Sequence, residues 1–243
     1  MADGKKVDRA DALAVEDEHD VPTVTDVVAV LTDAKPRMRG WLHAGAAVTS
    51  IVTGVVLVAV AGSLKGWQAG WSTAVYAVTI LALFSISALY HRVSWGPRGH
   101  AVMRRLDHSM IFVFIAGTYT PIAVLALPHR TGEIVLVVVW SGAALGVLLK
   151  MLWPAAPRWV GVPLYIALGW TAVFVLPDIL HGAGAAALVL IIVGGLAYTV
   201  GGIAYATKRP NPFPATFGFH EVFHACTIVA ATCHYIAIWL VLL

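Results

Sequence analysis

Apolar stretches of about 20 residues recur along most of this chain, and this pattern limits its fold more than any other feature. A helix of about 20 residues is long enough to cross the hydrocarbon core of a bilayer. The stretches are continuously apolar, whereas strands of a membrane barrel alternate every second residue. Hydrophobic residues make up 59% of the 243 residues and charged residues only 12%. The sequence therefore excludes a soluble domain and indicates an all-α integral membrane protein.

Seven such stretches can be counted, which predicts seven transmembrane helices. They run over 41–64, 71–91, 107–127, 133–152, 159–176, 183–205 and 220–243. Glycine and proline within them are tolerated, because neighbouring helices and side chains satisfy the backbone groups that they free. Residues 37–243 are therefore expected to form one seven-helix transmembrane domain.

The first 36 residues differ from the rest of the chain. Nine of the 13 acidic residues lie between Asp3 and Asp33. This mixed-charge segment has no sustained apolar run, so it cannot bury enough surface to offset the entropy of ordering it. It also lacks the basic start followed promptly by an apolar core that marks a signal peptide. We therefore expect residues 1–36 to form a flexible, water-exposed tail.

Lysine and arginine are distributed unevenly among the predicted loops. From Lys35 onward, eleven lie just before the first stretch or in every second loop after it, whereas the opposite loops hold only Lys65 and Arg130. The positive-inside rule then predicts a multi-pass protein of the inner (plasma) membrane, with a cytoplasmic N-terminus, a cytoplasmic tail and an external C-terminus. The net charge of +3 reflects this loop bias. No basic patch interleaved with aromatic residues accompanies it, so nucleic acid is not an expected partner.

This topology places several polar residues at one depth, near the cytoplasmic edge of the membrane. His91 ends the second stretch, which runs inward, while Asp107 begins the third and His220 and His224 begin the seventh, both of which run outward. His43 begins the first stretch at the same level. Polar side chains at this depth are costly and therefore rare where they serve no function. The agreement in depth thus predicts a functional site.

The chemistry of these residues suits a metal. His220 and His224 are four residues apart and project from one face of a helix, the usual way in which a helix offers two imidazoles to one ion. His91 is the best candidate for a third ligand. Three histidines with an open fourth position are typical of catalytic zinc, which lowers the pKa of a bound water to about 7. Asp107 is a candidate general base for that water, and Ser87 lies one turn before His91, where it is placed to support the site.

Each residue also has a structural interpretation. A histidine near the end of a membrane helix is more often an interfacial or hydrogen-bonded residue, although two imidazoles at this depth without a metal would be an expensive pairing. Taken alone, Asp107 could pair with a nearby basic residue, and Ser87 could bond back to a helix carbonyl. For His43, His108 and His234 a structural role is favoured over metal binding.

Three blocks of the sequence resemble the signature of a known family. They are SALYH at 87–91, the LDHS and AGTYTP segments within 106–121, and FGFHEVFH at 217–224. These blocks are similar to those of the hemolysin III group within the progestin and AdipoQ receptor family, and the resemblance extends over about residues 36–243. One block departs from it, because the stretch before His43 reads PRMRGWLH where bacterial relatives commonly carry Glu and Asn.

The resemblance implies a seven-helix membrane fold with a cytoplasmic N-terminus. It further implies zinc held by His91, His220 and His224, with Asp107 contacting the water on the zinc. Members of the family resemble alkaline ceramidases and are grouped with them as metal-dependent lipid hydrolases. The leading hypothesis is therefore a zinc-dependent hydrolase that cleaves an amide or ester bond of a membrane lipid at the cytoplasmic interface.

Two alternatives remain open from the sequence. His220-Glu221-x-x-His224 matches the HExxH motif of zinc metalloproteases, in which Glu221 would be the general base. Such proteases usually draw a further ligand from a later segment, and only nineteen residues follow His224. The other alternative is a receptor or a hemolysin-like lytic protein with a structural zinc. Against lysis, there is no long amphipathic segment, and the polar residues cluster at one end of the helices without lining a path through the membrane.

Overall fold

The computed structural model describes residues 36–243, so the tail predicted at 1–36 lies almost wholly outside the described residues. Within 36–243 every regular element is a helix, and the β-type pairing is confined to an isolated bridge between Phe213 and Phe217. The elements are α2 (Trp41–Lys65), α3 (Trp67–Arg92), α4 (Pro97–Ala126), α5 (His129–Leu152), α6 (Arg158–Gly169), the short 3-10 helix η1 (Trp170–Val175), α7 (Leu176–Thr207) and α8 (Phe219–Leu242). The prediction of an all-α protein is confirmed.

The described helices are long and apolar enough for a membrane. Six helical stretches within residues 36–243 could cross a bilayer by length and composition, and the 50-residue stretch 158–207 counts as one of them. Their outward surfaces are apolar, as shown by Val52, Leu145 and Phe174, which are 65%, 67% and 86% exposed. An apolar exterior of this extent would not be stable in water, so the protein is embedded in a membrane.

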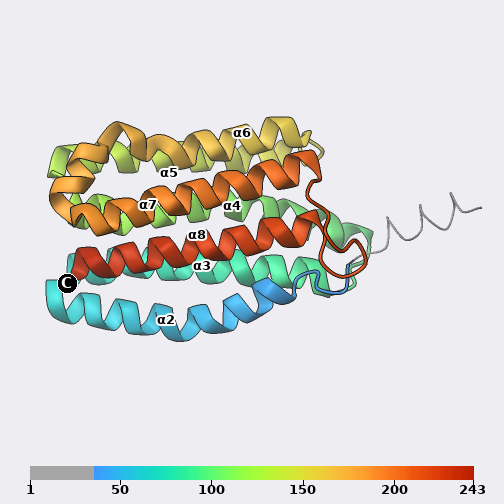
Figure 1. Ribbon diagram of the computed structural model, residues 1–243, viewed down its shortest axis with the longest axis horizontal. Helices are drawn as coiled ribbons and strands as arrows, with labels where there is room; N and C mark the ends of the chain where they lie inside the picture. The colour runs from blue at the N-terminus through green and yellow to red at the C-terminus, as the bar shows by residue number, and fades with distance from the viewer. Residues whose placement is uncertain (1–35) are drawn as a thin grey trace, which may run out of the picture. The chain divides into compact units, whose positions relative to one another are not determined.

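The stretch 158–207 is where the structure differs most from the predicted spans. α6 has only 12 residues and continues through η1 into α7, whose helix is interrupted at Gly184 by a backbone φ of 80°. Glycine is suited to this conformation because it has no Cβ. Figure 1 shows the chain turning back between α6 and the long part of α7, so that the two helices lie side by side, in agreement with the contacts between them. The number of membrane crossings, predicted as seven, stays a prediction.

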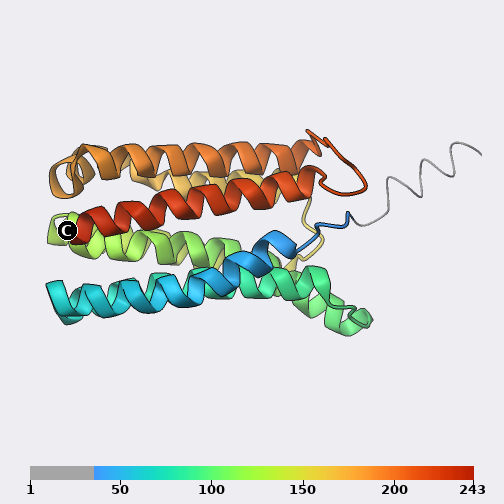
Figure 2. The same cartoon turned by 60° about the horizontal axis from the view of Figure 1, so that its bottom comes forward.

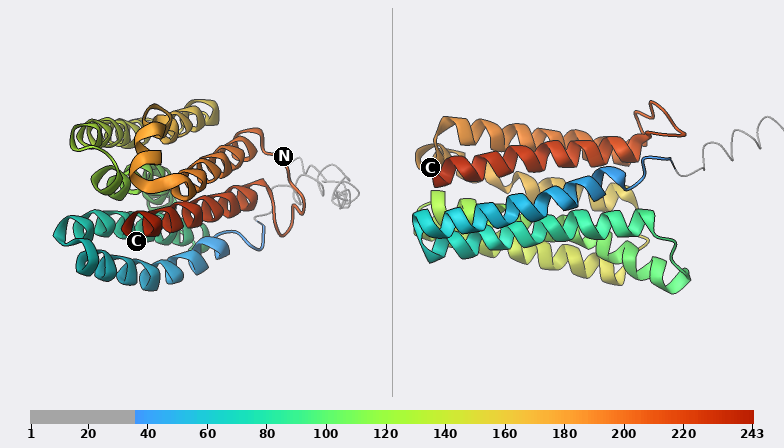
Figure 3. Two further views of the ribbon diagram at one scale, coloured as in Figure 1. Left: turned by 60° about the vertical axis from the view of Figure 1, so that its left-hand side comes forward. Right: turned by 90° about the horizontal axis from the view of Figure 1, so that it is seen from below.

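Helices that follow one another along the chain pack together, and α8 closes the bundle. α8 packs against α7 and also contacts α2 and α4. The first and last described helices, α2 and α8, therefore lie side by side (Figures 1 and 2). α4 is the most enclosed helix, since 61% of its most apolar window is buried, against 22–44% in the other stretches. Figure 3 shows the same arrangement from two further sides. Side chains on α4 therefore mostly face the interior of the bundle.

Small residues bring the helices close enough for this packing. A Cβ at Gly117 of α4 would lie 2.1 Å from the hydroxyl oxygen of Thr79 on α3, and one at Gly132 of α5 would lie 2.4 Å from the carbonyl oxygen of Ala123 on α4. Close approach of helix backbones is the main way in which membrane helices gain packing energy. Gly66, at φ 78°, reverses the chain between α2 and α3.

The start of α4 was predicted wrongly. The helix begins at Pro97, the favoured first position for proline, and not at Asp107. The added turns carry four basic or histidine residues, His100 and three arginines. Hydropathy excludes such a segment from a membrane span, although nothing prevents it from being helical. Asp107 therefore lies in the third turn of α4 rather than at its start.

Candidate metal centre

The first two turns of α8 hold two of the predicted ligands in a fixed orientation. α8 begins at Phe219, and the Glu221 carboxylate accepts a hydrogen bond of 2.9 Å from the Gly218 backbone N–H, which caps the start of the helix. His220 and His224 are one turn apart on this helix, with ring centroids 4.5 Å apart. The cap fixes where the helix starts and therefore where both imidazoles point.

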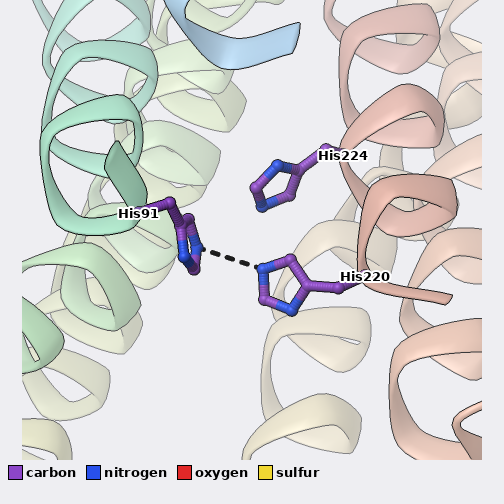
Figure 4. A group of neighbouring side chains, drawn as sticks. All are labelled: His91, His220 and His224. Carbon is purple, nitrogen blue, oxygen red and sulfur yellow. Dashed lines mark hydrogen bonds between the residues drawn. The ribbon is translucent and has the colours of Figure 1, made fainter. Parts of the chain in front are cut away.

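His91 reaches this pair from the last turn of α3. Its Nε2 lies 3.1 Å from Nε2 of His220, and one ring nitrogen from each of His91, His220 and His224 lies within 4.8 Å of the others. Figure 4 shows the three rings converging on one point from α3 and α8. The structure thus brings together all three histidines that were predicted as ligands, across 129 residues of sequence.

The three imidazoles fit a metal ion. Zinc binds histidine nitrogen at about 2.0–2.1 Å, so two nitrogens of a tetrahedral site lie about 3.3 Å apart. The separation between His91 and His220 is close to this value, and His224 is near enough to join them. His224 is 2% exposed, and its Nδ1 has no hydrogen-bond partner within residues 36–243. A buried nitrogen of this kind is costly unless a ligand satisfies it.

Asp107 and Ser87 lie at the same end of the bundle. Ser87 of α3 is buried, and its side chain interacts with the Asp107 carboxylate through a hydrogen bond. Nδ1 of His108 is 3.7 Å from an oxygen of Asp107, too far for a hydrogen bond, and is instead 2.7 Å from the Arg104 carbonyl. No lysine or arginine within residues 36–243 forms an ion pair with Asp107, so pairing with a basic residue does not explain its position.

A cavity of about 120 Å³ begins beside these groups and continues into the bundle. Asp107, Ser87, His220 and His224 line one end of it. Most of the remaining lining is aliphatic or aromatic, contributed by α3, α4, α6, η1, α7 and α8. It reaches as far as His234, which is 14 residues and thus about 21 Å along α8 from His220. The volume is small for this length, so the cavity is long and narrow.

His43, a weak candidate in the sequence, supports the triad. It projects from the first turn of α2, is 2% exposed and stacks on His224, with ring centroids 3.7 Å apart and planes 13° apart. It also lines the cavity. The favoured structural role fits this geometry, because the stacked ring restricts the rotation of His224. The sequence indicated His43 through its position at the start of the first apolar stretch, at the same depth as the other polar residues.

An ion pair that the sequence did not reveal holds α2 and α8 together at this end. Nε of Arg39 contacts the fully buried carboxylate of Glu221. Backbone hydrogen bonds from Arg37 and Met38 to the carbonyls of Ala215 and Thr216, both 3.1 Å, fix the segment that carries Arg39. Both carboxylate oxygens of Glu221 are therefore engaged, one by Gly218 and the other by Arg39. This geometry does not favour Glu221 as the general base of a metalloprotease.

We expect Glu221→Gln to destabilise the protein without removing its metal. The change leaves the Arg39 charge without its partner in a largely buried position, a loss on the order of 3 kcal/mol. Thermal unfolding of the detergent-solubilised protein measures the stability, and elemental analysis measures zinc. Glu133→Gln is the matched control, because Glu133 is 64% exposed and its contact with His129 should be worth well under about 1 kcal/mol. Unchanged stability with lost activity would instead support the protease interpretation.

The chain is similar to a family of known proteins over most of its length. The haemolysin-III related family matches residues 32–235. A Hemolysin-3 homolog of Bacillus subtilis is 30% identical over 154 residues, covering 63% of this chain and 69% of the relative. The human Monocyte to macrophage differentiation factor is 27% identical over 172 residues, covering 68% of each chain. A rice protein named Heptahelical transmembrane protein ADIPOR2 is 28% identical over 184 residues, covering 69% of this chain and 80% of the relative.

Proposed function

This chain belongs to the haemolysin-III related family, the hemolysin III group of the progestin and AdipoQ receptors, and on that premise we propose that it is a zinc-dependent lipid hydrolase. The reaction is cleavage of an amide or ester bond of a membrane lipid. One observation carries the proposal: three imidazoles, two of them buried and the third half-buried, lie with a carboxylate at the end of a long apolar cavity.

The residues present fit zinc, which His91, His220 and His224 would hold. When bound, zinc supplies a Lewis acid that polarises the scissile carbonyl and makes a water molecule acidic enough to react near neutral pH. The donor set is entirely imidazole, which zinc accepts readily, and leaves a fourth position for water or substrate.

In this proposal Asp107 transfers the proton of the attacking water, and Ser87 orients Asp107. The Asp107 carboxylate accepts a hydrogen bond from the attacking water, holds its proton and returns it to the departing amine or alcohol. Ser87 orients that carboxylate through the hydrogen bond between them. The apolar walls of the cavity take the acyl chain and exclude bulk water, which strengthens the electrostatic interactions at the reacting carbonyl.

The proposed topology places the site at the cytoplasmic interface. α6 with η1 covers 158–175, and α7 continues from the break at Gly184 to Thr207, which allows two crossings and a total of seven. The rice relative is named as heptahelical, which supports this number. The excess of basic residues then favours the cytoplasmic side of the plasma membrane for the triad and for the residues just before α2. A lipid whose scissile bond lies near its headgroup meets the triad at that depth.

The proposal is tested by incubating the purified protein, in proteoliposomes, with ceramides and with diacyl phospholipids. We expect release of fatty acid from one of these classes, loss of release on treatment with a chelator, and recovery when zinc is restored. Mass spectrometry of the released acid and elemental analysis of the protein are measured on the same samples. A protein that binds zinc and releases no acid from any class is a receptor or lytic protein with structural zinc, and the hydrolase proposal is then wrong.

A further inference from the structure

His234 lies deep in the bundle, ten residues and about 15 Å along α8 from His224. Its Nε2 is 3.2 Å from the carbonyl oxygen of Ile191, while its Nδ1 is buried with no hydrogen-bond partner within residues 36–243. The side chain is 9% exposed and lines the same cavity as the triad. Gly194 makes room for it, since a Cβ there would lie 2.4 Å from Nε2.

Tyr198 of α7 is the second polar residue at this depth without a partner. Its hydroxyl is buried and makes no hydrogen bond to any of residues 36–243, and its ring centroid is 5.6 Å from that of His234. It too lines the cavity. Each unsatisfied polar group inside a membrane costs several kcal/mol, so two of them side by side indicate a missing polar ligand.

Four other hydroxyl groups that line the cavity are satisfied by the protein itself. Thr118, Thr199 and Thr227 each donate to a carbonyl one turn earlier in their own helix, at 2.8–2.9 Å. The Tyr119 hydroxyl donates to the carbonyl of Gly169 and accepts from the Ala172 N–H. The other buried polar atoms of the lining without a partner within residues 36–243 are ring nitrogens of His43 and His224, which lie at the metal end. At the depth of His234, the lack of partners is therefore particular to His234 and Tyr198.

The available donors and acceptors specify the ligand. A neutral imidazole that donates from Nε2 to the Ile191 carbonyl can only accept at Nδ1. The Tyr198 hydroxyl can donate and accept. A group that satisfies both must donate to Nδ1 and accept from Tyr198, as a hydroxyl does. A carboxylate has no proton to donate, and an aliphatic chain offers neither function.

We infer that His234 and Tyr198 form a binding site for a hydroxyl group carried on the acyl chain of the substrate, about 15 Å from the metal centre. The inference rests on the proposed function in one respect, because it assumes that the carbonyl end of the chain lies at the triad. A long, narrow cavity suits a linear chain better than a fused ring system. The ligand class is therefore a lipid with a hydroxylated fatty acyl chain.

Ricinoleate and oleate provide a matched pair of probes, since they differ by one hydroxyl in the middle of the same unsaturated chain. Binding of each acid to the purified zinc-loaded protein is measured by displacement of a fluorescent fatty acid. We expect ricinoleate to bind about tenfold more tightly, as one or two added hydrogen bonds would provide. Tyr198→Phe should abolish the preference. Tyr119→Phe, which removes a hydroxyl from the same cavity that is already satisfied by Gly169, should retain it.

Three outcomes would overturn the inference: equal affinity for the two acids, a preference that persists in Tyr198→Phe, and binding of neither acid. In the first two cases a water molecule shared by His234 and Tyr198 accounts for their geometry. Failure of the hydrolase proposal is distinguishable. A ricinoleate preference without hydrolysis of any lipid keeps the hydroxyl site and rejects the enzyme, while hydrolysis without a preference does the reverse.

Discussion

His220→Ala is expected to remove most of the zinc from the purified protein. The histidine supplies one of three imidazoles whose nitrogens lie within 4.8 Å of one another, so two remain to hold the ion. Loss of a residue that merely orients a ligand weakens metal binding by about 10–100-fold, and loss of a ligand should cost more. His220 is the right member to change, because it is less buried than His91 and His224 and its truncation disturbs the packing least.

Zinc content at graded free zinc concentrations measures the effect, and fatty-acid release should fall in parallel. His129→Ala is the control, because that histidine has a side chain that is 88% exposed and lies at the start of α5. A variant of His220 that still binds one zinc with the affinity of the wild type would show that His91 and His224 hold the ion with other ligands. The proposed coordination would then be wrong, whatever the activity.

The helices could be predicted from sequence because a bilayer demands continuous apolar runs of fixed length. α2 and α5, observed at Trp41–Lys65 and His129–Leu152, begin and end within four residues of the predicted 41–64 and 133–152. The start of α4 and the break at Gly184 were missed for different reasons. Hydropathy reports where a segment enters the membrane, and a helix is free to begin earlier, as α4 does at Pro97. A glycine in an apolar run carries no sign that its φ will be positive.

The ends of the helices were enough to predict which residues meet, but not how their side chains are used. Alternating direction places His91 near His220 and His224 without any knowledge of packing. The partner of Glu221 could not be found in this way, because Arg39 is 182 residues distant and the sequence does not distinguish it from the neighbouring Arg37. Tyr198 gave no sequence signal either, and His234 was only a weak candidate for metal binding. Their common feature is the absence of a partner, which is visible only in three dimensions.

Asp107→Asn is expected to abolish lipid turnover while zinc stays bound. The amide has nearly the same shape as the carboxylate but cannot take the proton of the attacking water, and loss of a general base slows catalysis by about 10²–10⁴-fold. Ser87→Ala should have a smaller effect in the same direction, because it removes only the hydrogen bond that orients Asp107. Initial rates of fatty-acid release, with zinc measured on the same preparation, give both numbers.

Asp178→Asn is the matched control for this prediction, since Asp178 lies in the first turn of α7 and does not line the cavity that holds the triad. It should turn over lipid at the wild-type rate. Two results would contradict the assigned role of Asp107. Wild-type turnover in Asp107→Asn would exclude it as the base, and joint loss of zinc and turnover would make it part of the metal-binding set. Only loss of turnover with zinc retained assigns Asp107 to proton transfer and not to metal binding, because the three imidazoles are then shown to hold the ion without the carboxylate.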